Sequence, residues 1–275
     1  MSEPAVLSFP ATLPGLPPSS ISAGRYLVRF ARTADELDRI LRLRYEVFNL
    51  ELHEGLDAAH ASGRDEDEFD RRFHHLLIED TPSGEVVGTY RMQTAEMAGA
   101  GAGAGGYYSA GLFEVEALPE PVLRSAVEIG RACVARPHRN GRVLHLLWRG
   151  LAAYLAWNMK SKLFGCCSLT SQDEALGLAV HQHLLATGAV HPTLRIAPRP
   201  EHACGGGVPP ATDHRPPTTD SRSPLAVPAL FQAYLSLGAK ALGPPAVDPE
   251  FKTIDWLVLL DVAELDGFTF RSYFR

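Results

Sequence analysis

The 275-residue chain can form one large domain or two small ones, and its 45% hydrophobic and 21% charged content is typical of a globular protein. A net charge of −6 argues against general nucleic-acid binding, which needs a basic surface. Four cysteines without a Cys-x-x-Cys spacing predict reduced thiols, and the N-terminus lacks the pattern of a signal peptide, so we expect a cytoplasmic protein. No stretch approaches the ~18–20 unbroken apolar residues that span a bilayer, and peripheral contact with a membrane stays open.

The first half of the chain predicts a disordered arm followed by strands around one helix. Residues 1–23 are rich in Pro and Ser, which is typical of disorder. Thr33 and Glu36 form a capping-box pattern, after which apolar residues recur at helical spacing. We expect a strand over 25–32, then a helix over 33–52, then an acidic loop that runs from the end of this helix to Asp70. A hairpin of two strands, over 74–80 and 85–93, follows, and after it comes a mobile Gly/Ala stretch over 98–106.

The second half continues the alternation of strand and helix. We expect strands over 126–135, 162–169 and 253–262, helices over 142–158, 171–188 and 228–243, and a long irregular insertion around 197–228. This order predicts an α/β fold in which a single mixed central sheet is flanked by helices. We expect it to form one domain over residues 24–275.

Charge is unevenly placed along the chain. Residues 51–80 hold ten Asp or Glu against three Lys or Arg, whereas residues 124–162 hold eight Lys or Arg against one acidic residue, Glu128. A basic zone on an acidic protein favours a specific anionic ligand or partner. The alternative is a set of scattered surface arginines.

The basic zone centres on a turn between a strand and a helix, Arg139-Asn140-Gly141-Arg142. A helix that starts there offers free backbone N–H groups and a positive dipole end. With two arginines beside a glycine, the turn predicts a site for a phosphate-bearing ligand. Simple capping of the helix is the alternative.

Glu128 stands in an otherwise apolar strand, where a carboxylate is costly to bury unless it is paired or used. Arg131 follows three residues later, so a structural Glu–Arg pair is one interpretation. In a regular strand the two side chains face opposite sides, and they share a site only if the strand bulges or twists.

The segments "RNGRVLHLLWRGLAAYL" and "EIGRACV" resemble the acyl-donor region of the Gcn5-related N-acyltransferase (GNAT) fold. That fold's usual Arg/Gln-x-x-Gly-x-Gly/Ala pattern is altered here: Arg142 and Leu144 hold the small positions, and the glycine comes one place early, at Gly141. The departure argues against ordinary acetyl-CoA use.

Most of residues 25–262 is similar to the ornithine N-acyltransferases of bacterial ornithine-lipid synthesis, in the segments "LRLRYEVF", "DEFD", "HHLLIED", "GEVVGTYRM", "YYSAGLFE", "LFGCCS" and "DPEFKTIDWLVLLD". The resemblance implies transfer of a 3-hydroxyacyl chain from acyl carrier protein to the α-amine of L-ornithine, giving lyso-ornithine lipid. It implies no permanently bound cofactor, because the phosphopantetheine of the carrier brings the acyl group. The alternatives are a synthase for another N-acyl amino acid and a signal synthase of the acyl-homoserine lactone type.

The chain also resembles acyl-homoserine lactone synthases, whose signature residues are matched by Arg44, Phe48, Asp67, Asp70, Arg91, Glu128 and Arg131. The tryptophan that usually follows the first helix in that branch is absent.

These resemblances imply roles for the matched residues. Glu128 would be the general base, directly or through a water, with Arg131 beside it. Arg44, Arg91 or Arg131 could bind the substrate carboxylate. Asp67 and Asp70 could bind its side-chain ammonium, or equally could lie in a solvated acidic loop or clamp Arg44.

The basic zone gains a role from the same resemblance, because carrier proteins are strongly acidic. Arg136, Arg139, Arg142 and Arg149, with Asn140 and Gly141 in the turn, would meet the carrier and the phosphopantetheine phosphate. Apolar side chains near 146–164 are candidates for an acyl tunnel, although ordinary core packing is the alternative for each. We expect no metal site.

Overall fold

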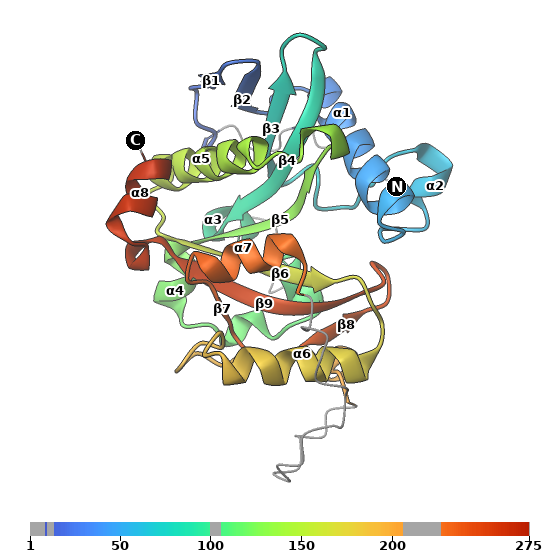
Figure 1. Cartoon of the computed structure of the whole chain (residues 1–275), viewed down its shortest axis with the longest axis vertical. Helices are drawn as coiled ribbons and strands as arrows, with labels where there is room; N and C mark the ends of the chain where they lie inside the picture. Colours follow the sequence, from blue (N-terminus) through green and yellow to red (C-terminus); the bar gives the residue numbers. More distant parts are fainter. Residues whose placement is uncertain (1–8, 10–13, 100–105, 206–226, 275) are drawn as a thin grey trace, which may run out of the picture.

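The computed structural model in Figure 1 describes residues 9, 14–99, 106–205 and 227–274. Its strands are β1 (Ile21–Ala23), β2 (Tyr26–Phe30), β3 (His74–Asp80), β4 (Glu85–Thr94), β5 (Ala126–Val134), β6 (Lys162–Leu169), β7 (Lys240–Ala241), β8 (Ala246–Asp248) and β9 (Thr253–Asp261). Its α-helices are α1 (Ala34–Tyr45), α2 (Ala59–Ser62), α3 (Ala95–Gly99), α4 (Glu120–Ser125), α5 (Arg142–Trp157), α6 (Glu174–Ala186), α7 (Ala229–Ser236) and α8 (Gly267–Tyr273).

All of these strands belong to one mixed sheet. Its order is β1-β2-β3-β4-β5-β6-β9-β7, and β8 pairs with β9 beside that path. Every neighbouring pair is antiparallel except β5 and β6, which run parallel. The prediction of an α/β fold with a single mixed sheet and flanking helices is therefore confirmed (Figure 1).

Helices cover both faces of the sheet, because successive side chains of a strand point in opposite directions. On β3, Leu76 packs in the core that includes Trp148 of α5 and Tyr234 of α7. Its neighbour Leu77 packs in a separate core with Ile40 of α1. Helices α1 and α5 therefore lie on opposite faces of the β3–β5 region.

The first helix begins as its sequence predicts. Thr33 and Glu36 form a complete capping box, which starts α1 at Ala34. The expected helix over 33–52 changes character after Tyr45, where a π-helical stretch, Glu46–Glu51, continues it. Phe48 lies in this wider turn, and its ring packs edge-on against that of Phe251 at a centroid distance of 5.5 Å. Such π turns often occur at functional sites.

Strands β5 and β6 separate soon after they begin. Their parallel pairing covers only residues 126–128 against residues 162–164, although both strands continue for several more residues. At the start of this separation Gly165 has no Cβ, and one placed there would come within 2.1 Å of the Ile129 carbonyl oxygen. The glycine allows the two backbones to lie close together before they part.

The prediction that residues 1–23 are disordered is wrong for residues 14–23. Leu16 is buried in the main core, and β1 pairs with β2 from Ile21 opposite Val28. The backbone of this segment is also held by side chains, since Asn158 donates to the Gly15 carbonyl at 2.9 Å and Arg32 to the Pro17 carbonyl at 2.8 Å. Residues 1–8 and 10–13 lie outside the described part of the chain.

Two other predicted irregular segments are only partly described. Most of the expected insertion, residues 206–226, and most of the Gly/Ala stretch, residues 100–105, lie outside the described residues. The described start of the insertion is irregular apart from a short 3-10 turn over Pro200–His202. Within the described ranges, no helix has both the length and the apolar character needed to cross a membrane.

Candidate functional site

The central strand β5 carries a bulge at Arg131. Thr89 of β4 lies opposite Cys133, whereas Arg91 lies opposite Gly130, so Arg131 and Ala132 together face the single residue Tyr90. Arg131 has a φ of +49°, in the left-handed region that costs a non-glycine residue about 1–3 kcal/mol. Strain of this kind persists only where surrounding contacts hold it, and it is concentrated at functional sites.

The bulge brings Glu128 and Arg131 to the same neighbour, as a shared site requires. Glu128 accepts a hydrogen bond from the Tyr108 backbone N–H at 3.0 Å, and Arg131 donates to the Tyr108 hydroxyl at 3.1 Å. The two side chains do not pair with each other among the described contacts. They hold opposite ends of one tyrosine instead.

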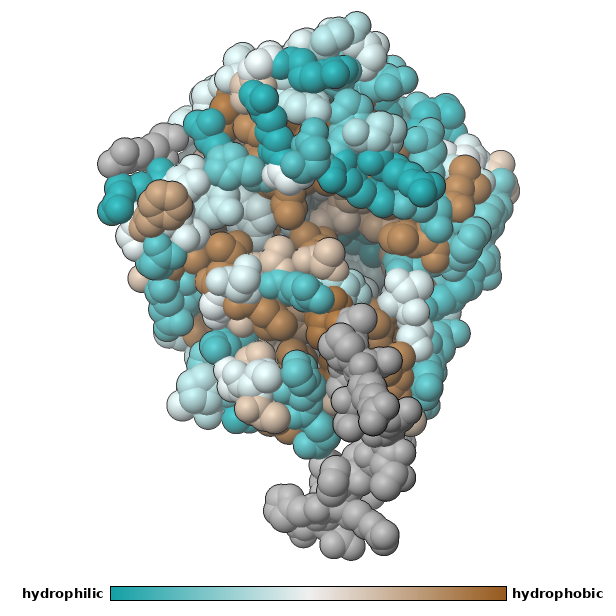
Figure 2. Space-filling model, in the orientation of Figure 1, coloured by the Kyte–Doolittle hydropathy of each residue, from teal (hydrophilic) through white to brown (hydrophobic). Residues whose placement is uncertain are grey.

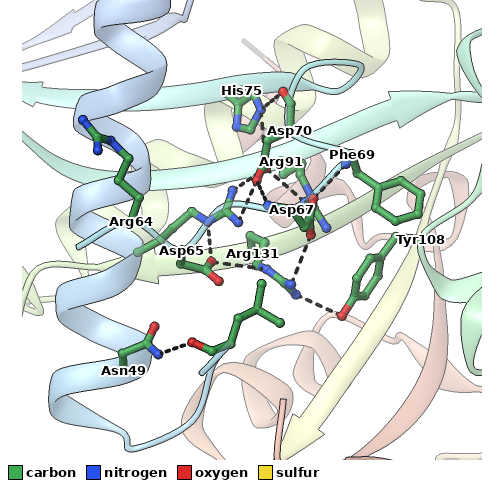
Figure 3. A network of polar contacts seen from close by, with 12 residues as sticks. Asn49, Arg64, Asp65, Asp67, Phe69, Asp70, His75, Arg91, Tyr108 and Arg131 are labelled. Atoms are coloured by element: carbon green, nitrogen blue, oxygen red, sulfur yellow. Dashed lines mark hydrogen bonds and ion pairs between the residues drawn. The ribbon is translucent and has the colours of Figure 1, made fainter. Parts of the chain in front are cut away.

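A buried network of three arginines and three aspartates lies beside the bulge (Figure 3). Arg44 of α1 donates from Nε to Asp65 at 2.7 Å and from Nη1 to Asp70 at 2.5 Å. Arg91 of β4 reaches Asp67 at 2.6 Å and Asp70 at 3.0 Å.

Arg131 completes this network from the bulge. Its Nη2 donates to Asp67 at 3.2 Å, and its Nε lies 3.4 Å from an Asp65 oxygen. The network therefore joins helix α1, the 65–70 turn and strands β4 and β5. It balances three positive charges against three negative ones.

Because the network is buried, its positive and negative charges must balance for the fold to be stable. The side chains of Arg44, Asp65 and Asp70 are 0% exposed. Burial alone would raise the pKa of Asp70, but the guanidinium groups of Arg44 and Arg91 hold it well below its usual range. Asp70 therefore stays ionised at neutral pH, as its pairing with two buried arginines requires.

Arg44, Asp70 and Arg91 are buried against one another, and they are not among the described residues that line the nearby cavity. Their expected contacts with substrate stay a prediction. The alternative, a clamp of aspartates on Arg44, is the arrangement observed. Asp67 also pairs with Arg91 and Arg131, so its charge is already balanced.

Beside the network, a cavity of about 260 Å³ opens where β5 and β6 part. Figure 2 shows this face of the molecule hollowed near its middle, with hydrophobic surface around the hollow. Arg131 lines the cavity, with its guanidinium 4.0 Å from the Phe251 ring centroid and 4.8 Å from that of Tyr108. Phe48 also lines it, so these two predicted residues do meet at one site.

Much of the cavity wall is apolar. It is formed by Leu230, Phe231 and Tyr234 of α7, Val258 and Leu260 of β9, and Ile129, Leu163 and Phe164 at the strand separation. Among the apolar side chains near 146–164 that were candidates for a tunnel, Leu163 and Phe164 line the cavity. Leu146, Leu147 and Trp148 pack in the core instead.

Glu128 lies beneath the cavity and is not among its described lining residues. Its carboxylate is 2% exposed and accepts four hydrogen bonds: from Gln93 Nε2 at 2.9 Å, the Tyr108 and Ser109 backbone N–H groups at 3.0 and 2.7 Å, and the Ser109 hydroxyl at 2.6 Å. Burial raises the pKa of Glu128, and the four donors oppose the rise. These contacts suit an anchor for residues 108–109, and a base role stays a prediction that would need an intervening water.

The predicted basic turn lies on the surface at the start of α5. Arg136, Arg139, Asn140, Gly141 and Arg142 are exposed, whereas Arg149, two turns further along the helix, is half-buried. Gly141 has a φ of +78° as the N-cap. Arg139 is bound to Glu51, with Nη2 2.8 Å from Oε2, so part of the turn's charge is balanced.

Several residues of this site had no predicted role. Asp65 was placed in an acidic loop, and Tyr108 appeared only within the resembling segment "YYSAGLFE". Three carboxylates line the cavity: Glu54, and Asp248 and Asp255 from the resembling segment "DPEFKTIDWLVLLD". The isolated position of Asp255 among the apolar residues of β9 could have drawn attention to it. No group of three or more His, Cys, Asp or Glu side chains in the described residues is arranged to hold a metal ion.

Comparison with known proteins gives consistent matches. A family model for an acetyltransferase (GNAT) domain matches residues 43–149, which include the ion network, Glu128 and the basic turn. A protein of Rhizobium meliloti (strain 1021) named L-ornithine N(alpha)-acyltransferase is 31% identical over 248 residues, covering 87% of this chain and 81% of that protein.

Proteins of the same name from two other bacteria are similar to the same degree. The protein of Agrobacterium fabrum is 33% identical, and the match covers 91% of this chain and 85% of that protein. The protein of Rhodobacter capsulatus is 32% identical, and the match covers 86% of this chain and 90% of that protein. Among solved structures, the CoA-dependent acyl-homoserine lactone synthase BjaI with SAM and isopentyl-CoA has a TM-score of 0.48 at 14% identity. That match covers 86% of this chain and 80% of that one.

The ion network predicts a large stability loss when its balance is broken. Asp70→Ala leaves Arg44 and Arg91 with excess buried positive charge, so we expect the free energy of unfolding to fall by about 3–5 kcal/mol. Asp38, which pairs with Arg42 and Arg64 near the surface, provides the control, and Asp38→Ala should cost less than about 1 kcal/mol. Urea denaturation measures both, and equal losses would contradict the account.

Glu128→Gln separates an anchor from a base. A glutamine presents an NH₂ group to a site filled with donors, so an anchor role predicts a stability loss of about 1–3 kcal/mol together with lower turnover. Glu120→Gln on the surface of α4 is the matched control, for which we expect no measurable change. Thermal unfolding and turnover are measured on the same samples, and lost turnover at unchanged stability would favour the base.

Proposed function

Because the chain belongs to the L-ornithine N(alpha)-acyltransferase family, we propose that it transfers a 3-hydroxyacyl group from acyl carrier protein to the α-amine of L-ornithine, giving lyso-ornithine lipid. Membership makes it an acyltransferase with a GNAT domain. The amino acid, the carrier-bound donor and the lipid product are the parts that we propose. The observation that carries them is the cavity at the strand separation, which joins an apolar wall to a cluster of charged side chains.

The cavity must align the two reactants, hold the acyl chain and stabilise the oxyanion that forms during the reaction. The amine nitrogen attacks the thioester carbonyl, a C–N bond forms, the C–S bond breaks, and the proton lost by the amine leaves with the pantetheine thiol. Alignment of amine and thioester supplies much of the rate. The acyl chain needs an apolar wall, and the α7 and β9 side chains offer one. The developing oxyanion needs a donor.

We assign the oxyanion donor to the bulge in β5. A bulge leaves one residue out of the ladder of backbone hydrogen bonds, so a backbone N–H of Arg131 or Ala132 is available to a ligand. Ala132, Gly130 and Arg131 line the cavity. A fixed donor at this place would stabilise the tetrahedral intermediate without reorganisation, a contribution that typically amounts to about 10²–10³ in turnover.

The basic turn would dock the carrier protein. Arg136, Arg139 and Arg142 are exposed at the start of α5, where backbone N–H groups and the helix dipole also favour a phosphate. Carrier proteins present acidic helices, so opposite charges would steer the encounter. The half-buried position of Arg149 makes its contribution to this surface smaller.

A substrate panel tests the proposal. The protein is incubated with 3-hydroxypalmitoyl carrier protein and, one at a time, ornithine, lysine, glycine and S-adenosylmethionine, and the products are read by mass spectrometry. We expect an N-acyl product from ornithine in large excess over the others. Equal products from several amino acids would support a broader N-acyl amino acid synthase, and a product from S-adenosylmethionine would support a signal synthase. Either result rejects the ornithine assignment.

Charge reversal tests the docking surface. Arg139 is bound to Glu51, so the double variant uses Arg136→Glu and Arg142→Glu, which take part in none of the described ion pairs. We expect the KM for carrier protein to rise about tenfold or more at low salt, with the difference shrinking at high salt. Arg124→Glu on α4 is the control, since Arg124 is also exposed but lies away from the turn. A KM that does not differ from the control's would refute this docking surface.

A further inference from the structure

Three carboxylates line the same cavity as Arg131. Asp255 lies on β9 opposite Ser168 of β6, and Asp248 ends β8, where it pairs with Thr253 at the start of β9. Glu54 follows the π-helical stretch and accepts a hydrogen bond from the hydroxyl of Thr170, the residue after β6. Asp255, Asp248 and Glu54, called the Asp255 cluster below, are 2%, 5% and 7% exposed.

The charges of the Asp255 cluster are not balanced by the protein. None of the ion pairs described for this chain involves these three residues, in contrast to Asp65, Asp67 and Asp70, which are each matched by an arginine. Asp255 Oδ2 accepts from the Thr253 hydroxyl at 3.3 Å, while its buried Oδ1 has no hydrogen-bond partner among the described atoms. An unpaired buried carboxylate oxygen beside a cavity indicates a missing donor.

The electrostatics of the cluster favour a cation. Burial raises the pKa of Asp255 to about 7; the hydroxyl groups of Ser168 and Thr253 oppose the rise, and the charges of Asp248 and Glu54 add to it. Burial also raises the pKa of Glu54. A positive charge held among the three carboxylates would relieve both the repulsion and the cost of burial.

We propose that the Asp255 cluster is the subsite for the side-chain ammonium of a diamino acid substrate, an inference that rests on the proposed function. An ammonium carries three N–H donors and no acceptor, which matches a site built from three acceptors. Arg131 is the cationic residue among the described lining residues, and the substrate's carboxylate would share its guanidinium with Asp65 and Asp67. The bulge in β5, which lines the same cavity, would receive the reacting amine.

Asp255→Asn tests the subsite with two substrates that differ only at the proposed contact. Norvaline has the carbon chain of ornithine without the terminal amine. We expect the variant to raise the KM for ornithine about 30-fold or more, with kcat within about threefold of the parent and norvaline acylation unchanged. Asp35→Asn, at an exposed position on α1, is the control. An equal fall in kcat for both substrates would overturn the subsite and assign Asp255 to proton transfer.

A binding measurement keeps this inference separate from the proposed reaction. Calorimetry with 1,4-diaminobutane, a diamine without a carboxylate, should detect binding to the parent and a loss of at least about tenfold in Asp255→Asn. Glu54→Gln should weaken binding in the same direction. If the parent acylates no amino acid but binds the diamine through Asp255, the proposed function fails and the cation subsite stands. Equal diamine binding by the parent and both variants overturns the subsite.

Discussion

The left-handed backbone at Arg131 is the constraint on which the site depends. It inserts an extra residue into β5, interrupts the pairing with β4 and turns the guanidinium toward Asp65, Asp67 and Tyr108. A non-glycine residue adopts this conformation only when its surroundings compensate. The compensation comes from the buried arginine–aspartate network and from the rings of Tyr108 and Phe251, whose centroids lie 4.8 and 4.0 Å from the guanidinium. Functional geometry and core stability are thus linked at one residue.

Two sets of buried acidic residues lie near Arg131, and they differ in whether arginines balance their charge. The aspartates of the 65–70 turn are neutralised one for one by buried arginines, so they hold α1, β4 and β5 together and have no charge to offer a ligand. The Asp255 cluster has the same burial without the matching cations. The first arrangement stabilises the fold, whereas the second stores an electrostatic cost that a bound cation would relieve. This contrast, rather than the number of carboxylates, identifies where a cationic substrate group would bind.

The sequence predicted features that depend on local patterns. The capping box of α1, the hairpin of β3 and β4, the apolar face of α5 and the exposed basic turn all follow from residues within a few positions of one another. It also indicated that Glu128 and Arg131 could share a site only across a bulge, which the structure contains. Short strands such as β1 and β8 were missed, because three residues are too few to show an alternating pattern, although each strand pairs with the next one along the chain.

The roles of individual charged residues were harder to predict than the elements that carry them. Asp65 and Asp70 lie in a stretch whose composition indicates a solvated loop, yet contacts with Arg44, more than 20 positions earlier, bury them completely. Asp255 faces the cavity only because of the register between β6, β8 and β9. Such contacts follow from tertiary packing, which composition and spacing do not record.

The central claim is that acyl donor and amine meet in the gap between β5 and β6, beside the bulge. The most direct measurement is a crystal structure of the protein with L-ornithine and a stable thioether analogue of the 3-hydroxyacyl phosphopantetheine arm. The account predicts the pantetheine arm between the two strands, with the carbonyl mimic near the backbone N–H groups of Arg131 and Ala132. A donor analogue bound elsewhere, with the gap still empty or filled by side chains, would contradict it.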